Sequence, residues 1–117
     1  MYAEGRGVGK DDAEAVRWYR KGAEQGDVDA QGGLGYMYIE GRGVIKDEAE
    51  AVRWFRKAAE QGHAQAQCVL GAVYSIGIGV AEDDAEAVRW YRKAAEQGDA
   101  SAQNALRERG LSWQVNR

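Results

Sequence analysis

Apolar side chains recur every three to four residues through most of this chain, which is the spacing of one face of an α-helix. In residues 11–26, Val16, Tyr19 and Ala23 share a face, and charged side chains occupy the opposite face. The segments 28–40 and 64–76 show the same periodicity with fewer charges. The pattern therefore predicts helices in all three segments, each with a wide apolar stripe.

One stretch of this pattern repeats almost letter for letter. Residues 11–26 read DDAEAVRWYRKGAEQG, and they return as DEAEAVRWFRKAAEQG at 47–62 and as DDAEAVRWYRKAAEQG at 83–98. Each copy starts 36 residues after the previous one (47 − 11 and 83 − 47). A fixed period of this length is typical of an array of stacked helical units. We therefore expect an all-α repeat protein.

Short polar residues and glycines mark the ends of the predicted helices. Asp11 precedes an apolar run and Glu14 follows three residues later, which is the spacing of an N-terminal capping box, and the pair recurs one and two periods later. Gly26 and its counterparts stand where a left-handed residue ends a helix. Residues 1–10 match 37–46. We therefore expect them to form the tail of a helix and the loop after it.

The repeat period divides the chain into a solenoid over 1–109 and a tail. The expected units are a partial repeat that lacks its first helix, two full repeats, a capping helix and the tail: 1–27, 28–63, 64–99, 100–109 and 110–117. Charged residues at 107–109 replace small or apolar ones, which gives the capping helix the polar outer face that a terminal unit needs. In the tail, Leu111, Trp113 and Val115 stand at alternate positions, which is not a helical pattern.

Two residue types inside the helices predict how the helices pack. Gly35 and Gly71 lie mid-helix, each at a cost of roughly 1 kcal/mol relative to alanine. A recurring cost of this kind indicates a close helix crossing. Trp18, Trp54 and Trp90 recur at the repeat period, and we expect them to form a buried ladder in the core rather than a ligand site.

The composition is ordinary for a single soluble domain, with 117 residues, 30% charged and 44% hydrophobic. The net charge is −3, and glutamates interleave with the basic residues of the repeated helix, so we expect a solvated face and no nucleic-acid binding. No apolar run approaches the ~18 residues of a membrane span, so no membrane insertion is expected. A single cysteine leaves cytoplasmic and periplasmic locations both open.

No motif predicts catalysis, a cofactor or a metal site. The segment 5–10 lacks the first glycine and the final Ser or Thr of a phosphate-binding loop, so a turn is expected there. The single His63 and the single Cys68 are too few for a metal site. They lie near the start of one predicted helix, but no orienting third group or oxyanion loop accompanies them as a nucleophile pair.

The repeat also carries a specific set of small, aromatic and apolar positions. In one copy these are Ala64, Ala66, Leu70, Gly71, Tyr74, Gly77, Gly79, Val80, Asp83, Ala87, Trp90, Ala94, Ala95 and Gly98. Together they resemble the Sel1-like repeat (SLR), a relative of the tetratricopeptide repeat (TPR), over residues 1–109. The chain departs from that pattern at Gly32-Gly33 and after Leu106. The resemblance implies a right-handed, TPR-like α-solenoid of antiparallel helix pairs, with first helices on the concave side and second helices on the convex side.

The resemblance also implies a function. Members act mostly as adaptors or scaffolds, many of them bacterial, so we expect a non-catalytic module that binds a protein or peptide segment on its concave face. An alternative is a bacterial immunity protein that neutralises a secreted toxin enzyme. A weaker alternative is a β-lactam hydrolase, as in a cysteine-rich branch whose paired cysteines this chain lacks.

Positions that change between repeats indicate where a partner binds. The second helix of each pair is nearly constant, whereas the groove-facing positions of the first helix differ from copy to copy. Partner contact and unconstrained drift both account for this difference. We expect Tyr36 to be the main anchor, because exposed aromatic residues are common at interfaces. The predicted site residues are Asp29, Tyr36, Ile39, Glu40, Gln65, Cys68, Ala72, Ser75, Ile76 and Asn104, with Gly32, Ser101 and Glu108 at related positions.

The missing first helix of the partial repeat leaves Val16, Trp18 and Tyr19 without a packing partner in the predicted array. If the chain is complete, this apolar edge must be covered. A homodimer, or the tail of a neighbouring copy, is then expected to cover it. An upstream helix would remove that need.

Overall fold

The computed structural model describes residues 6–113, with side chains from Asp11 onward. Within this range the chain forms six α-helices and no strand. In chain order the helices are α1 (Arg6–Glu24), α2 (Val28–Glu40), α3 (Glu48–Glu60), α4 (Ala64–Ile76), α5 (Asp84–Glu96) and α6 (Ala100–Glu108). The predicted all-α fold is confirmed, and the helices predicted over 28–40 and 64–76 have the predicted bounds.

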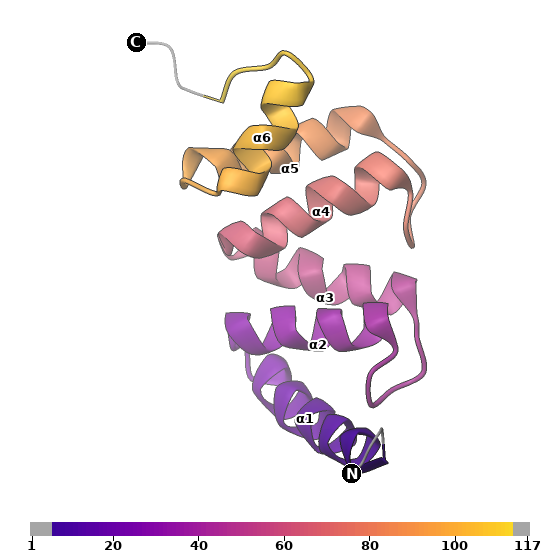
Figure 1. The fold of residues 1–117 in the computed structure, drawn as a ribbon. Helices are drawn as coiled ribbons and strands as arrows, with labels where there is room; N and C mark the ends of the chain where they lie inside the picture. Colours follow the sequence, from indigo (N-terminus) through magenta and orange to yellow (C-terminus); the bar gives the residue numbers. More distant parts are fainter. Residues whose placement is uncertain (1–5, 114–117) are drawn as a thin grey trace.

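The helices stack in chain order into an elongated array with α1 and α6 at opposite ends (Figure 1). The array measures 53 × 26 × 25 Å along its principal axes. Each helix packs mainly against the helix before it and the helix after it, as expected of a solenoid, whose units contact only their neighbours. We call α2, α4 and α6 the A helices, and α1, α3 and α5 the B helices.

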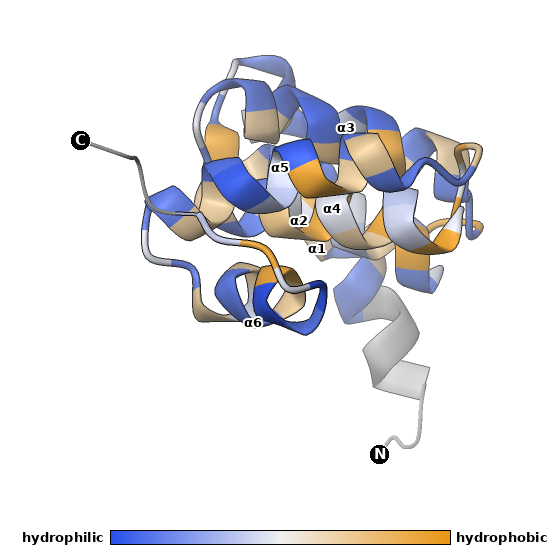
Figure 2. Cartoon of the chain, turned by 90° about the horizontal axis from the view of Figure 1, so that it is seen from above, coloured by the Kyte–Doolittle hydropathy of each residue, from blue (hydrophilic) through white to orange (hydrophobic). Residues whose placement is uncertain are grey.

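The apolar stripes meet in three clusters along the array. The central cluster joins α3, α4 and α5 around Phe55, Leu70 and Trp90. A second cluster joins α5 and α6, and a third joins α1 and α2. Phe55 and Leu70 are fully buried, and burying a side chain of this size contributes about 1.5–3 kcal/mol. Hydrophilic and hydrophobic residues alternate along the helices in Figure 2, which is the predicted amphipathic pattern.

The predicted aspartate caps form at α3 and α5. The carboxylate of Asp47 accepts a hydrogen bond from the N–H of Glu50 at 3.0 Å, and Asp83 repeats this contact at the start of α5, which satisfies a free donor of the first turn. The other half of the capping box takes a different form. The N–H of Asp47 donates to the carbonyl of Tyr38 in α2 at 3.0 Å, so the loop is pinned to the preceding A helix.

The prediction for the start of the first B helix is wrong. α1 begins at Arg6, so Asp11 lies inside the helix, and the loop or turn expected before it is helical over residues 6–10. Asp47 and Asp83 are held at their helix starts by tyrosine carbonyls. The tyrosine one period earlier, Tyr2, lies outside the described residues.

The predicted close helix crossing at the mid-helix glycines is confirmed. A methyl group added at Gly71 would lie 2.6 Å from the ring of Tyr91 in α5, and one added at Gly35 would lie 3.0 Å from the ring of Phe55 in α3. α3 and α5 therefore each place an aromatic ring directly on the backbone of the A helix before them. Glycine leaves room for that ring because it has no Cβ.

Of the three tryptophans in the predicted ladder, Trp90 alone is fully buried. Trp90 is 3% exposed and packs into the central cluster, Trp54 is half-buried against the α1–α2 cluster, and Trp18 is 66% exposed. The predicted core role is therefore wrong for Trp18. Trp54 and Trp90 each pack on the helix pair before them, and the described residues contain no pair before Trp18. The indole N–H of Trp54 also donates to Glu50, and that of Trp90 to Glu86, each at 3.2 Å.

The C-terminal helix is covered by its own tail. The N–H of Leu111 donates to the carbonyl of Leu106 at 2.9 Å, which folds the chain back after α6. Leu111 and Trp113 then pack against the α5–α6 cluster. The predicted non-helical tail is confirmed as far as Trp113, and Val115 lies outside the described residues. Leu111 and Trp113 of this tail therefore cover the α5–α6 cluster of their own chain.

The outer face of the capping helix is polar in part. Residues 107–108 are exposed, as predicted. Arg109 turns inward instead, with its guanidinium 5.3 Å from the centre of the Tyr91 ring. It donates to the carboxylate of Asp84 at 3.1 Å and to the hydroxyl of Ser75 at 2.8 Å. Arg109 thereby ties α6 to both α4 and α5.

Candidate functional site

A hollow of about 440 Å³ lies between α2, α4 and the start of α6. Its lining comes from all three A helices and the residue before α6, and we call it the A-helix groove. The lining residues are Tyr36, Gln65, Cys68, Val69, Ala72, Asp99 and Ser101. Four of the ten predicted site residues therefore lie around one hollow.

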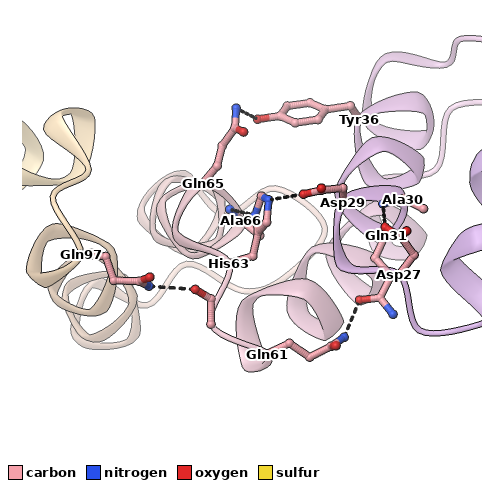
Figure 3. Close-up of polar contacts among 11 residues, drawn as sticks. Asp27, Asp29, Ala30, Gln31, Tyr36, Gln61, His63, Gln65, Ala66 and Gln97 are labelled. Atoms are coloured by element: carbon pink, nitrogen blue, oxygen red, sulfur yellow. Dashed lines mark hydrogen bonds and ion pairs between the residues drawn. The ribbon is translucent and has the colours of Figure 1, made fainter.

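Tyr36 is held in place at this groove. Its ring meets the ring of Phe55 edge to face, with centroids 5.0 Å apart, and its hydroxyl accepts a hydrogen bond from Gln65 Nε2 at 3.4 Å (Figure 3). Burial raises the pKa of Tyr36, the Gln65 contact opposes that rise, and the negative charges of Glu40 and Asp99 add to it. About a third of the side chain, 36%, is exposed. The groove thus presents a fixed aromatic surface.

The other predicted site residues lie elsewhere. The carboxylate of Asp29 is 3.2 Å from Nε2 of His63, as drawn in Figure 3. Ile39 packs against the central cluster, and Ser75 receives the hydrogen bond of Arg109. Three more residues are exposed outside the groove lining: Glu40, Ile76 and Asn104. Binding at any of the ten residues stays a prediction.

Sequence reasoning missed two residues of the groove, Val69 and Asp99. Val69 follows Cys68 in α4 and contributes to the lining as well as packing against the central cluster. Asp99 caps α6 by accepting the N–H of Ala102 at 2.9 Å. Its capping role is visible in the sequence. Its place beside the groove depends on how closely α6 approaches α4.

Cys68 forms part of the groove wall as a protonated thiol. Burial, followed by the charge of Asp99 and a hydrogen bond to it, raises the pKa of the Cys68 thiol to about 12. A nucleophilic cysteine needs a lowered pKa. His63 is engaged elsewhere, because its Nδ1 accepts the N–H of Ala66 at 3.1 Å at the start of α4 and its Nε2 faces Asp29. Cys68 and His63 therefore do not form an activated nucleophile.

A ladder of glutamines joins neighbouring repeats, and sequence reasoning missed it. Gln67 donates to the carbonyl of Ala59 at 3.1 Å and accepts from Gln97 at 2.9 Å. One period earlier, Gln61 donates to Gln31 at 2.8 Å (Figure 3). Gln31 and Gln67 are each only 4% exposed. The recurrence of these glutamines at the repeat period is the feature of the sequence that could have predicted the ladder. The ladder helps to position α2 and α4, which lie on either side of the groove.

The basic residues of the B helices are largely engaged within the chain. In α3, Arg53 pairs with Glu50 at 2.8 Å, Arg56 donates to the hydroxyl of Tyr74, and Lys57 lies 5.9 Å from the centre of the Trp54 ring. These contacts are those of a solvated, internally compensated face. That this face binds no nucleic acid stays a prediction.

Within residues 6–113, no group of three or more His, Cys, Asp or Glu side chains could hold a metal ion. None of the helices described there is long and apolar enough to cross a bilayer.

The stacked helices and the groove across them define an α-solenoid repeat protein, a class whose extended faces serve as binding surfaces. The Sel1 repeat matches the sequence three times, at residues 1–27, 28–63 and 64–99. The chain therefore belongs to the Sel1 repeat family, as its resemblance predicted. Proteins of this family are generally interaction or scaffold modules, and they are generally non-catalytic.

Three solved structures have the same architecture. A protective antigen of uropathogenic Escherichia coli strains with an SLR fold is 49% identical, with a TM-score of 0.80 over 85% of this chain and 22% of the antigen. A Sel1 repeat protein from Oxalobacter formigenes is 48% identical, with a TM-score of 0.78 over 80% of this chain and 70% of that protein. Cysteine-rich protein B of Helicobacter pylori is 26% identical, with a TM-score of 0.75 over 78% of this chain and 68% of that protein.

This chain thus spans about a fifth of the length of the E. coli antigen. All three proteins are bacterial, which agrees with the expected bacterial origin. No curated protein matches the sequence.

Proposed function

We propose that the chain is a non-catalytic binding module that holds a protein or peptide segment in the A-helix groove. The observation that supports this function is the groove itself, a hollow of about 440 Å³ between successive A helices. Tyr36 stands in its lining with a fixed and partly exposed ring. Aromatic side chains beside a hollow often carry much of the binding energy of an interface.

The way the lining varies also supports binding. Ala72 has Tyr36 and Glu108 at the positions one period before and after it, and Cys68 has Gly32 and Asn104. Buried B-helix positions keep the same or a similar residue, as with Phe55 and Tyr91, because packing fixes their size and shape. Groove positions are free of that constraint, so they are available for contacts with a particular partner.

The chemistry of the groove favours binding over turnover. Its polar groups are the hydroxyls of Tyr36 and Ser101, the amide of Gln65, the carboxylate of Asp99 and a thiol whose pKa is raised to about 12. These groups are suited to offer a bound segment hydrogen bonds and one ionic contact. The Asp99 carboxylate that contacts the Cys68 thiol raises the pKa of that thiol and so does not activate it as a nucleophile.

Capture of partners from a lysate of the source organism tests this function. The bait is the whole chain, compared with Ala72→Arg, which fills the groove, and Tyr36→Ala, which removes the aromatic ring. Glu60→Gln on α3 is the control, because Glu60 is exposed and lies outside the groove. Circular dichroism confirms that each variant is folded.

We expect one dominant protein that the chain and the control retain and that both groove variants lose. A protein that every variant retains would move the binding site to another face, and no captured protein would contradict the proposal. If the captured protein is a toxin enzyme that loses its activity on binding, the module acts as an inhibitor, which is the alternative that the sequence raised.

A further inference from the structure

Charge is distributed unequally between the two kinds of helix. α2 contains Asp29 and Glu40 but no lysine or arginine, and α4 contains none of the four charged residue types. Each B helix, in contrast, carries an Arg-x-x-Arg-Lys set within its repeated stretch. α2 and α4 thus contribute two carboxylates and no cation of their own, and these carboxylates lie 3.2 Å from His63 and 3.6 Å from Arg42, respectively.

Asp99 is the charged residue in the groove lining. It is half-buried, and its Oδ1 accepts the N–H of Ala102 at 2.9 Å. Its negative charge contributes, after burial, to the raised pKa values of Tyr36 and Cys68. Both of these side chains line the groove, so the negative field of Asp99 acts across it.

The arginines of the α6 region are engaged elsewhere. Arg107 lies over the ring of Trp113 at 5.4 Å and donates to Asn104. Arg109 pairs with Asp84 at 3.1 Å. Neither arginine belongs to the groove lining. The charge of Asp99 therefore has no arginine or lysine partner among the lining residues.

The rest of the lining suits a short peptide segment. Val69 and Ala72 offer apolar contact, while the exposed Gln65 and Ser101 offer hydrogen bonds to a peptide backbone. The volume of about 440 Å³ falls at the small end of the usual range for ligand sites, about 300–1,000 Å³. It has room for one or two side chains of a partner rather than for a folded domain.

We propose that the groove takes a peptide segment in which an apolar side chain lies next to a lysine or arginine, and that this cation pairs with Asp99. The inference rests on the proposed function and specifies its partner. The apolar side chain packs on Val69 and Ala72 beside Tyr36. An acidic segment would bring a second carboxylate toward Asp99 in a partly dehydrated site, where like charges repel strongly.

Selection from a library of random peptides displayed on phage tests this proposal. The immobilised target is the whole chain, and each enriched peptide is synthesised and its Kd is measured. Asp99→Asn removes the charge but keeps a good N-cap for α6. Glu60→Gln removes an exposed carboxylate from α3 and serves as the matched control for net charge.

We expect the enriched peptides to contain a lysine or arginine next to an apolar residue. The Ala72→Arg variant should no longer bind these peptides. Asp99→Asn should weaken their binding by about two- to fivefold at low salt, which corresponds to a partly exposed ion pair. Glu60→Gln should leave the Kd unchanged. Replacing the lysine or arginine of the peptide by glutamine should raise the Kd for the unaltered chain as much as Asp99→Asn does. The same peptide change should leave the Kd for the Asp99→Asn variant unaltered.

The outcomes separate this inference from the proposed function. If no peptide is enriched, or if the Ala72→Arg variant still binds the enriched peptides, both the proposed binding in the groove and this inference are wrong. Peptides that need the groove but are acidic or neutral, or that bind Asp99→Asn equally well, would overturn only the charge preference.

Discussion

The side-chain amide of Gln97, the residue that caps the end of α5, donates a hydrogen bond to the side-chain carbonyl of Gln67 in α4 at 2.9 Å. Gln67 in turn donates to the main-chain carbonyl of Ala59 near the end of α3 at 3.1 Å. One buried side chain of α4 thus connects this helix to the end of α3 and to the C-terminal cap of α5. Through this contact the packing of the B helices controls the position of α4, which carries most of the groove lining.

Replacing Gln67 by methionine should lower the free energy of unfolding by about 1–3 kcal/mol. Methionine keeps the side-chain volume but removes the two hydrogen bonds that Gln67 makes, each of which contributes about 0.5–1.5 kcal/mol. The Gln97 amide still donates to the carbonyl of Gly62 at 2.9 Å, and the carbonyl of Ala59 still accepts the N–H of Gly62 at 3.0 Å. Urea denaturation measures the loss. Gln103→Met is the matched control, because Gln103 is less buried and its one described side-chain contact is with the carbonyl of Ala95. An equal loss in both variants would contradict the bridging role of Gln67.

Gly71→Ala and Gly22→Ala should change stability in opposite directions. Alanine at Gly71 forces its methyl group against the ring of Tyr91, 2.6 Å away, and overpacking of this kind costs about 1–3 kcal/mol. The repeat already has alanine at the two positions equivalent to Gly22, Ala58 and Ala94. A methyl group at Gly22 would lie 3.0 Å from the Cβ of Ala30, a contact that a shift of a few tenths of an ångström relieves, so Gly22→Ala should stabilise the protein by up to about 1 kcal/mol. Thermal unfolding by circular dichroism compares the two. A stabilised Gly71→Ala would refute the close crossing.

Trp90→Ala and Trp18→Ala should differ widely in stability although the two residues have nearly identical sequence neighbours. Trp90 is 3% exposed, and removing it leaves a cavity that costs about 3–5 kcal/mol. Trp18 is 66% exposed, and its removal should change the free energy of unfolding by less than about 0.5 kcal/mol. Denaturant titration of both variants decides the matter. A large loss for Trp18→Ala would show that this edge is packed in solution, as the predicted homodimer requires.

Cys68 should react slowly with iodoacetamide in the folded chain. Only the thiolate reacts, and a pKa of about 12 in place of the ordinary 9.0 leaves roughly a hundred to a thousand times less thiolate at pH 8. The rate should rise with pH up to about 12, whereas in urea it should be fast and level off near pH 9. Mass spectrometry follows the modification. A folded-state rate equal to the rate in urea would contradict the buried thiol beside Asp99.

The sequence was sufficient to predict the repeated parts of the fold. Amphipathic spacing and glycine punctuation are local signals, and they predicted α2 and α4 with the bounds observed. The mid-helix glycines predicted the close crossing because each carries a local cost that a tertiary contact must explain. Three nearly identical copies of a motif therefore predicted both the helices and their mode of packing.

The errors arose where equivalent residues have different surroundings. Trp18 and Trp90 share a motif, but within residues 6–113 a preceding helix pair packs against Trp90 and none precedes Trp18. Asp11 shares a motif with Asp47. The N–H of Asp47 donates to the carbonyl of Tyr38 at the start of α3, whereas Asp11 lies inside α1. Repetition predicts what is common to the copies. It does not predict how the ends of the array differ from its middle.

The groove could be predicted only in part for a related reason. Helical periodicity placed Gln65, Cys68 and Ala72 on one side of α4, and all three line the groove with Tyr36. Asp99 was missed because its contribution depends on the distance between α4 and the start of α6. Periodicity within one helix carries no information on that distance.

Amide chemical shifts of the nitrogen-15-labelled chain, recorded during titration with a captured partner segment or an enriched peptide, would locate the bound segment residue by residue. The binding account predicts that the largest shift changes occur at Gln65, Ala72 and Ser101 and elsewhere on α2, α4 and the start of α6. Changes confined to the outer faces of α3 and α5, around residues such as Arg53 and Lys93, would contradict it and place the binding surface on the B helices.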